Sequence, residues 1–116
     1  MTRGARTPEE LETLLEDTFI VRDSSALALL FEDAAVLAAG SGIPEARGRD
    51  EIAGAATAMW ERERTYVADP RRVLQAGDTV LSFGRGINVL RRGPDRAWRY
   101  AIAVIDPEEL EMTEER

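Results

Sequence analysis

Residues 89–100, Val-Leu-Arg-Arg-Gly-Pro-Asp-Arg-Ala-Trp-Arg-Tyr, decide the fold, because they predict two strands joined by a tight Gly-Pro-Asp turn. The second strand has a two-residue period, in which large side chains alternate with the small or charged ones. The large set is Trp98, Tyr100, Ile102 and Val104. Residues 79–91 predict one long strand, bent at Gly84 and Gly86 so that the sheet curls.

Helical segments come before this sheet. Thr7, Pro8 and Glu10 predict a capped helix over 8–21, and a shorter helix is expected over 25–31. A third helix follows Gly48, with Asp50 as its cap. Short strands are predicted at 34–39, 43–47, 65–68 and 71–76.

This order predicts one α+β domain over residues 1–116. About three N-terminal helices are expected to fold over a curved antiparallel sheet, with a core over 7–106 and an acidic tail over 107–116.

Composition restricts the chemistry. The chain has no Cys, His or Lys, so thiolate, imidazole and Schiff-base chemistry are excluded, and Asp, Glu and Tyr remain for proton transfer. The net charge of −7 argues against nucleic-acid binding, and no apolar run is long enough to span a membrane. The polar N-terminus lacks a signal core, which predicts a cytoplasmic protein.

The charge is nevertheless uneven. Residues 71–99 carry +5 and the other residues carry −12. Two interpretations stay open: a basic sheet edge that attracts an anionic ligand, or an edge strand protected by charge.

Two further runs carry a family resemblance: Ala-Leu-Leu-Phe-Glu-Asp-Ala-Ala-Val over 28–36 and Gly-Arg-Asp-Glu-Ile over 48–52. In this order of elements, the chain resembles the nuclear transport factor 2-like superfamily. More narrowly, it looks like the SnoaL-like branch, which contains ketosteroid isomerases and polyketide cyclases. Residues 89–100 are similar to the terminal hairpin of many small bacterial members.

The resemblance implies a cone around an apolar cavity and a homodimer formed through the outer sheet face. The superfamily includes isomerases, cyclases, dehydratases and catalytically inert binders, so fold alone does not choose among them. The positions of the isomerase Tyr and Asp correspond by spacing to Leu15 and Ala38, so steroid-isomerase chemistry is not expected.

Strand alternation suggests candidate catalytic residues. It puts Arg85 and Asp106 on one face with Tyr100 and the other large side chains, pointing at the helices. Asp106 is then the candidate acid/base, with Tyr100 or Arg85 polarising an oxygen. An ion pair between Arg85 and Asp106 at the mouth of the cone is the alternative.

Candidate ligand-binding residues are Trp60, Phe19, Tyr66, Trp98 and Asn88. Ordinary core packing is the alternative for Trp60. Asn88 falls on the opposite, smooth face and has a dimer contact as its alternative. That face is predicted to hold Gly84, Gly86, Asn88, Ala101 and Ala103, and to form the dimer.

The sequence therefore predicts a protein that binds a small, mostly apolar molecule under the sheet, without a metal or a cofactor. Whether it also catalyses an isomerase-, cyclase- or dehydratase-like proton transfer stays open. The alternative is a non-catalytic dimerisation or accessory domain whose cavity is filled by its own side chains.

Overall fold

The first helix has the bounds predicted from its cap, whereas the second, predicted over 25–31, ends at Leu29 because Phe31 begins a strand. The structure, a computed structural model, describes residues 4–40, 42–66 and 69–105. Its elements are α1 (Pro8–Val21), α2 (Ser24–Leu29), β1 (Phe31–Ala38), β2 (Ala46–Arg47), α3 (Arg49–Glu61), β3 (Arg72–Ala76), β4 (Thr79–Phe83), β5 (Gly86–Arg92) and β6 (Trp98–Ile105). The Thr7 hydroxyl accepts from the Glu10 N–H at 3.0 Å. Asp23 caps α2 through the Ala26 N–H at the same distance.

The third helix begins differently from the prediction. Its N-cap is Gly48, with φ +84°, and no side chain caps it, so the cap predicted at Asp50 is wrong. Glu51, in the first turn, accepts from the Arg47 N–H at 2.9 Å. The Gly48 N–H donates to the Ala35 carbonyl at 2.9 Å, which ties the start of α3 to β1.

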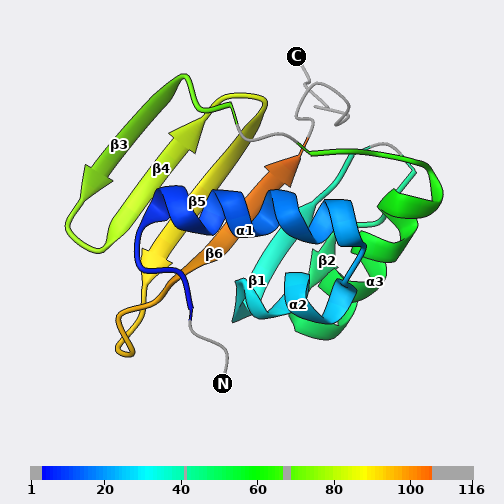
Figure 1. Ribbon diagram of the computed structural model, residues 1–116, viewed down its shortest axis with the longest axis horizontal. Helices are drawn as coiled ribbons and strands as arrows, with labels where there is room; N and C mark the ends of the chain where they lie inside the picture. The colour runs from blue at the N-terminus through cyan, green and yellow to red at the C-terminus, as the bar shows by residue number, and fades with distance from the viewer. Residues whose placement is uncertain (1–3, 41, 67–68, 106–116) are drawn as a thin grey trace, which may run out of the picture.

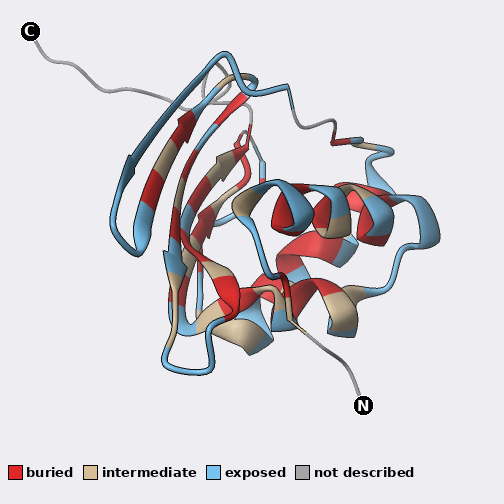
Figure 2. Cartoon of the chain, turned by 60° about the vertical axis from the view of Figure 1, so that its left-hand side comes forward, coloured by how far each residue is buried: buried red, intermediate tan, exposed pale blue. Residues whose placement is uncertain are grey.

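Six strands form one curved, open sheet in the order β2-β1-β6-β5-β4-β3. Neighbouring strands run antiparallel except β1 and β6, which are parallel, so the sheet is mixed and not wholly antiparallel as predicted. Helix α1 lies across the strands (Figure 1), and the sheet curves around the helices (Figure 2). This arrangement confirms the predicted α+β cone.

The segment 79–91 is a hairpin and not one bent strand. Gly84 and Arg85 form the turn between β4 and β5, and the Gly84 N–H donates to the Gly86 carbonyl at 2.9 Å. A Cβ on Gly84 would lie 2.3 Å from the Asp69 carbonyl oxygen, so close approach of the preceding loop requires glycine there.

Two smaller expectations also change. Of the strand predicted over 65–68, Thr65 and Tyr66 are outside any strand, and 67–68 lie outside the described residues. The turn after β5 is longer than the tight Gly-Pro-Asp turn that was predicted, because the Gly93 N–H donates to the Ala97 carbonyl at 2.9 Å.

A β-bulge in β6 decides which side chains face the helices. Leu90 pairs with Tyr100 and Val89 pairs with Ile102, so Ala101 is an extra residue without a partner in the register. Tyr100 points inward on one side of the bulge and Ala103 on the other, and both are fully buried.

The predicted faces of β5 and of the later half of β6 are wrong, because the longer turn pairs Leu90 and not Val89 with Tyr100, and the bulge then exchanges the faces of Ile102 and Ala103. Residues placed against the helices by alternation alone are exposed or half-buried on the outer side: Phe83, Ile87, Val89, Ile102 and Val104. Residues placed on the smooth outer face are buried inside: Gly86, Asn88 and Ala103. The inward prediction holds for Trp98 and Tyr100, which precede the bulge.

Two glycine substitutions have opposite expected effects on stability. Gly84→Ala forces the new Cβ against the Asp69 carbonyl and is expected to destabilise the protein by about 1–3 kcal/mol. Gly54→Ala, in the interior of α3 with no atom within 4 Å of the new Cβ, is expected to stabilise it by about 0.5–1 kcal/mol. Urea unfolding measures both changes. An equal effect of the two substitutions contradicts the close approach at Gly84.

Candidate functional site

Five polar side chains meet in the interior between α1 and the sheet, and we call them the interior polar cluster. They are Glu12, Tyr66, Ser82, Asn88 and Tyr100. Glu12 comes from α1, Ser82 from β4, Asn88 from β5 and Tyr100 from β6, while Tyr66 lies in the segment after α3. All five are buried, so their polar groups must satisfy one another or an added molecule.

Glu12 is the acidic member of the cluster. It accepts a hydrogen bond from the Ser82 hydroxyl at 3.3 Å. Burial raises the pKa of the Glu12 carboxyl above its usual value; the Ser82 hydrogen bond opposes this rise, and the nearby charges of Glu9 and Glu16 add to it. A carboxyl with a raised pKa lies closer to the range in which it exchanges protons at neutral pH.

The two tyrosines of the cluster are neutral hydrogen-bond donors at neutral pH. Burial and the charge of Glu12 raise the pKa of Tyr66 to about 12, although Asn88 and Tyr100 favour its ionised form through their side chains. Burial is the main reason that the pKa of Tyr100 lies well above its usual value, and Tyr66 and Glu12 raise it further. Glu12 is therefore close enough to influence both phenol groups.

Two buried donors lack a hydrogen-bond acceptor within the described part of the chain. They are the Tyr100 hydroxyl and the Trp60 Nε1–H. The Tyr66 hydroxyl is near that of Tyr100 and interacts with it, but the pair does not reach the geometry of a formed hydrogen bond. A buried donor without an acceptor costs about 1–3 kcal/mol, so an added acceptor would stabilise each of these two groups.

Aromatic rings surround these donors. The Phe19 ring lies 5.7 Å from the Trp60 ring, edge to face, and 5.7 Å from the Tyr66 ring. The Phe31 and Tyr100 rings lie 5.2 Å apart. The interior thus combines an apolar wall with a few polar groups, which is the usual make-up of a small-molecule site.

A small hollow reaches the cluster from outside. It has a volume of about 40 Å³ and lies between the start of α1 and the β3–β4 hairpin. Its lining consists of Pro8, Glu9, Glu12, Pro70, Val73, Val80, Ser82 and Leu90. Glu12 and Ser82 therefore stand where the interior meets this entrance.

The structure brings together most of the predicted ligand-binding residues. Phe19, Trp60, Tyr66 and Tyr100 surround one region of the interior, and Asn88 joins them from a position predicted to be on the outer face. Trp98 is also buried, but its contacts are elsewhere. Its backbone N–H donates to the Ala5 carbonyl at 2.9 Å, and the Arg92 guanidinium lies 5.5 Å from the centre of its ring.

Two predicted catalytic residues are outside this group. Arg85 is exposed in the β4–β5 turn, so its predicted place on the inner face is wrong. Asp106 lies outside the described residues, and its role stays a prediction.

The residues that sequence reasoning missed are Glu12 and Ser82. The signal for Glu12 was its helical spacing, because it lies on the same face of α1 as the buried Leu15 and Phe19. Ser82 was placed within a single long strand that the structure divides.

Residues 4–40, 42–66 and 69–105 contain no group of three acidic side chains placed to hold a metal ion. The helices of these ranges are too short or too polar to cross a membrane.

Comparison with known proteins identifies the fold. No family profile matches the chain, and no curated protein matches its sequence. Three of the similar solved structures are a ketosteroid isomerase-like protein from Erwinia carotovora atroseptica, a Thiobacillus denitrificans protein assigned as a calcium/calmodulin-dependent protein kinase type II association domain, and an NTF2-like protein with a cystatin-like fold from Novosphingobium aromaticivorans.

Their likeness covers most of each chain. The isomerase-like protein is 21% identical with a TM-score of 0.69, over 83% of this chain and 89% of its own. The association domain is 17% identical with a TM-score of 0.73, over 90% and 98%. The third is 23% identical with a TM-score of 0.65, over 82% and 75%. The chain therefore has the nuclear transport factor 2-like fold that its order of elements predicted.

Burial of Glu12 makes the stability of the protein depend on pH. Because the pKa of Glu12 is raised in the folded state, folding favours the protonated carboxyl, and this contribution is lost as the pH rises from 4.5 through the folded pKa. Glu12→Gln keeps an acceptor for Ser82 and cannot ionise. We expect it to be more stable than the wild type at about pH 7, with the difference shrinking toward about pH 4.

Thermal unfolding across this pH range measures the effect. Asp17→Asn is the matched control, since Asp17 is an exposed acid on the same helix. A pH-independent difference for Glu12→Gln, or an equal effect of Asp17→Asn, contradicts the assignment.

Proposed function

We propose that the protein binds a small, mostly apolar molecule with one oxygen atom in the interior of the cone. The observation that carries the proposal is the pair of buried donors, the Tyr100 hydroxyl and the Trp60 Nε1–H, without an acceptor among the described residues. A carbonyl or hydroxyl oxygen would accept from them, and the surrounding rings would contact the apolar part of the ligand.

The ligand would enter beside Glu12 and Ser82, between α1 and the β3–β4 hairpin. The hollow of about 40 Å³ at this place is smaller than the roughly 300 Å³ at which small-molecule sites begin, so entry requires β3 to move outward. Strand β3 is suited to this movement, because all five of its residues are exposed and Val73, on its inner face, is 49% exposed.

The same site supports a proton transfer, for which we propose Glu12 as the acid/base. The ionised Glu12 carboxylate would take a proton from the carbon next to a ligand carbonyl. The electron pair of the broken C–H bond would move onto the carbonyl oxygen, which accepts from the Tyr100 hydroxyl, and Glu12 would return the proton to carbon. The isomerase-like name of a structural neighbour supports this class of reaction. Asp106 keeps its predicted role as a second candidate base.

A second candidate function is dimerisation, supported by the outer face of the sheet. Two rows of paired residues make this face apolar: Leu74, Leu81, Val89 and Ile102 form one row, and Phe83, Ile87 and Val104 lie in the next. We propose a second copy of the chain as the occupant, packed face to face through these residues. The association domain among the neighbours fits this use of the fold. The predicted homodimer is kept, with different residues at its interface.

Binding is tested with 1-indanone, an apolar bicycle with one carbonyl oxygen, and with indane, which lacks that oxygen. The chain has two tryptophans, so the indole N–H signal of Trp60 reports on the interior and that of Trp98 serves as an internal control. We expect 1-indanone to shift the Trp60 signal alone, and indane to bind about tenfold more weakly. Tyr100→Phe should remove most of that difference. Equal affinities for the two compounds, or a shift of Trp98 only, contradict the site.

Proton transfer is tested in the same samples by deuterium exchange at the carbon next to the 1-indanone carbonyl. We expect the wild-type protein to accelerate exchange and Glu12→Gln to remove the acceleration while binding persists. Binding without acceleration in the wild type leaves a binding protein and contradicts the catalytic role of Glu12.

Dimerisation is tested by sedimentation of Ile102→Arg and Leu29→Arg. Both wild-type side chains are exposed, 45% for Ile102 on the outer sheet face and 54% for Leu29 on α2. We expect Ile102→Arg to weaken the dimer by about tenfold or more, because it would bury unpaired charge, and Leu29→Arg to leave it unchanged. A monomeric wild type, or equal effects of the two variants, contradicts the outer-face dimer.

A further inference from the structure

Three arginines from three elements converge on one groove, which we call the arginine groove. Arg49 comes from the first turn of α3, Arg91 from β5 and Arg99 from β6. The groove has a volume of about 500 Å³ and is also lined by Glu32, Asp33, Gly93, Pro94 and Asp95. This volume falls within the range of small-molecule sites.

The arginine groove is separate from the interior of the cone. Phe31 and Tyr100 are fully buried under the sheet, and their chain neighbours Glu32 and Arg99 line the groove. Because successive side chains of a strand point to opposite faces, Arg99 reaches the groove from the outer side of β6, opposite the buried Tyr100.

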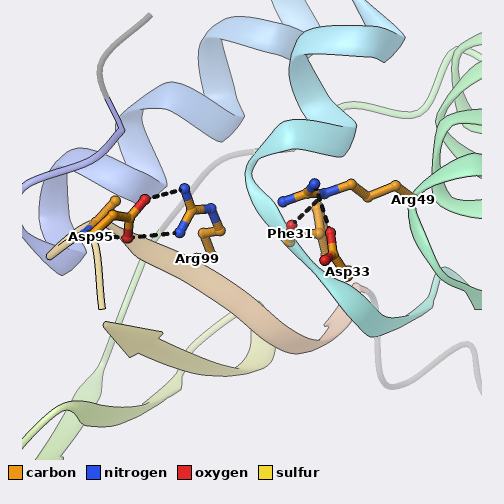
Figure 3. A network of polar contacts seen from close by, with 6 residues as sticks. Phe31, Asp33, Arg49, Asp95 and Arg99 are labelled. Atoms are coloured by element: carbon orange, nitrogen blue, oxygen red, sulfur yellow. Dashed lines mark hydrogen bonds and ion pairs between the residues drawn. The ribbon is translucent and has the colours of Figure 1, made fainter. Parts of the chain in front are cut away.

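Each guanidinium in the groove is held in place by protein acceptors. Arg49 donates to the Phe31 carbonyl at 2.9 Å and pairs with Asp33 at 2.8 Å. Arg99 donates to both oxygens of Asp95, at 3.1 and 2.6 Å. Figure 3 shows the Arg99–Asp95 pair on one side and Arg49 with Asp33 and the Phe31 carbonyl on the other.

Arg91 is fixed in the same manner, donating to both oxygens of Glu32, at 3.1 and 2.6 Å. In the contacts described, each of the three arginines uses two of the five N–H groups that a guanidinium carries. The three guanidinium groups are therefore held in place, and each retains N–H groups that can donate to a ligand.

At Arg49 and Arg99 the depth of the charged groups favours an anion, whereas the Arg91–Glu32 pair has the opposite order, with side chains 55% and 28% exposed. The Asp33 side chain is 89% exposed, whereas those of Arg49 and Arg99 are 33% and 27% exposed, so the guanidinium groups lie deeper than the carboxylate of Asp33. The positive end of the α3 dipole lies at Arg49. Exposed ion pairs contribute about 0–1 kcal/mol each, so stability alone does not account for three of them gathered at one groove.

We propose that the arginine groove binds the anionic group of a small organic acid, a carboxylate or a phosphate, between Arg49 and Arg99. The remaining N–H groups of these two side chains hold the anion, and Arg91 adds positive charge from β5. The exposed Asp33 carboxylate pairs with the Arg49 guanidinium and therefore competes with the ligand for its N–H groups. Two of the seven arginines of residues 71–99, Arg91 and Arg99, line this groove.

Calorimetric titration at low salt tests the proposal with two probes, succinate and inorganic phosphate, which distinguish the two anion types. We expect saturable binding of at least one probe, with a Kd of about 1 mM that weakens with added salt. Arg49→Gln and Arg99→Gln should each weaken it about tenfold. Asp33→Asn should tighten it about threefold, because it frees a guanidinium N–H and removes a negative charge.

Arg92→Gln is the matched control. Arg92 is also a β5 arginine paired with an aspartate, Asp78, but it does not line the groove, so binding should be unchanged. Thermal unfolding confirms that each variant is folded. No saturable binding to either the wild type or Asp33→Asn overturns the proposal, as does an equal loss in Arg92→Gln. Neither result bears on the interior site, whose probes carry no charge.

Discussion

The β-bulge at Ala101 is the constraint on which the rest of the structure depends. By adding one residue to β6, it lets Tyr100 and Ala103 both point toward the helices, while Ile102 points outward beside Val89. Ala103 pairs with Asn88 on the neighbouring strand, so a small side chain stands next to the amide that faces Tyr66. A regular strand in the same place would have exchanged these faces. The bulge therefore exchanges the faces of Ile102 and Ala103, whereas the register that pairs Leu90 with Tyr100 turns Asn88 toward the interior.

Burial of the interior polar cluster lowers the stability of the fold, and packing of the core does not require these polar groups. The surrounding core already contains fully buried large side chains, among them Leu11, Leu15, Phe31 and Met59. Leucines at the positions of Glu12 and Tyr100 would avoid the burial of a carboxyl group and of a donor without an acceptor. Places where a sequence departs from such local rules are most often functional sites. That argument favours the interior as a binding site over a cone filled only for packing.

Sequence patterns predicted the elements better than the faces. Thr7 and Asp23 each have a capping oxygen with one local partner, so these helix starts follow from a few neighbouring residues. The bulge has no such signal, because Ala101 fits a regular strand as well as a bulge. The turn at Gly84 and Arg85 depends on the approach of the Asp69 carbonyl, a contact between segments that no local pattern contains.

Only part of the candidate site was predicted, because local patterns again do not contain the contacts between distant segments. Its aromatic members were found because large apolar residues at helical or strand spacing are expected to be buried. Glu12 was missed, because an acidic residue on a helix usually lies on the solvated face. Asn88 was found as a candidate, but its face was assigned from a shorter turn after β5 than the structure has, which moves the register with β6 by one residue.

Composition explains why the two proposed sites carry different chemistry. All fifteen basic residues are arginines, and a guanidinium stays charged at any ordinary pH, so it is costly to bury unless it is paired. Carboxyl and phenol groups can enter an apolar interior in their neutral forms. With His, Lys and Cys missing from the chain, the buried groups that can exchange a proton are limited to Asp, Glu and Tyr. The permanent charges of Arg91 and Arg99 are held on the outer side of β5 and β6, and Arg49 joins them from the start of α3. Proton transfer is therefore suited to the interior of this sheet, and recognition of a fixed charge is suited to its outer side.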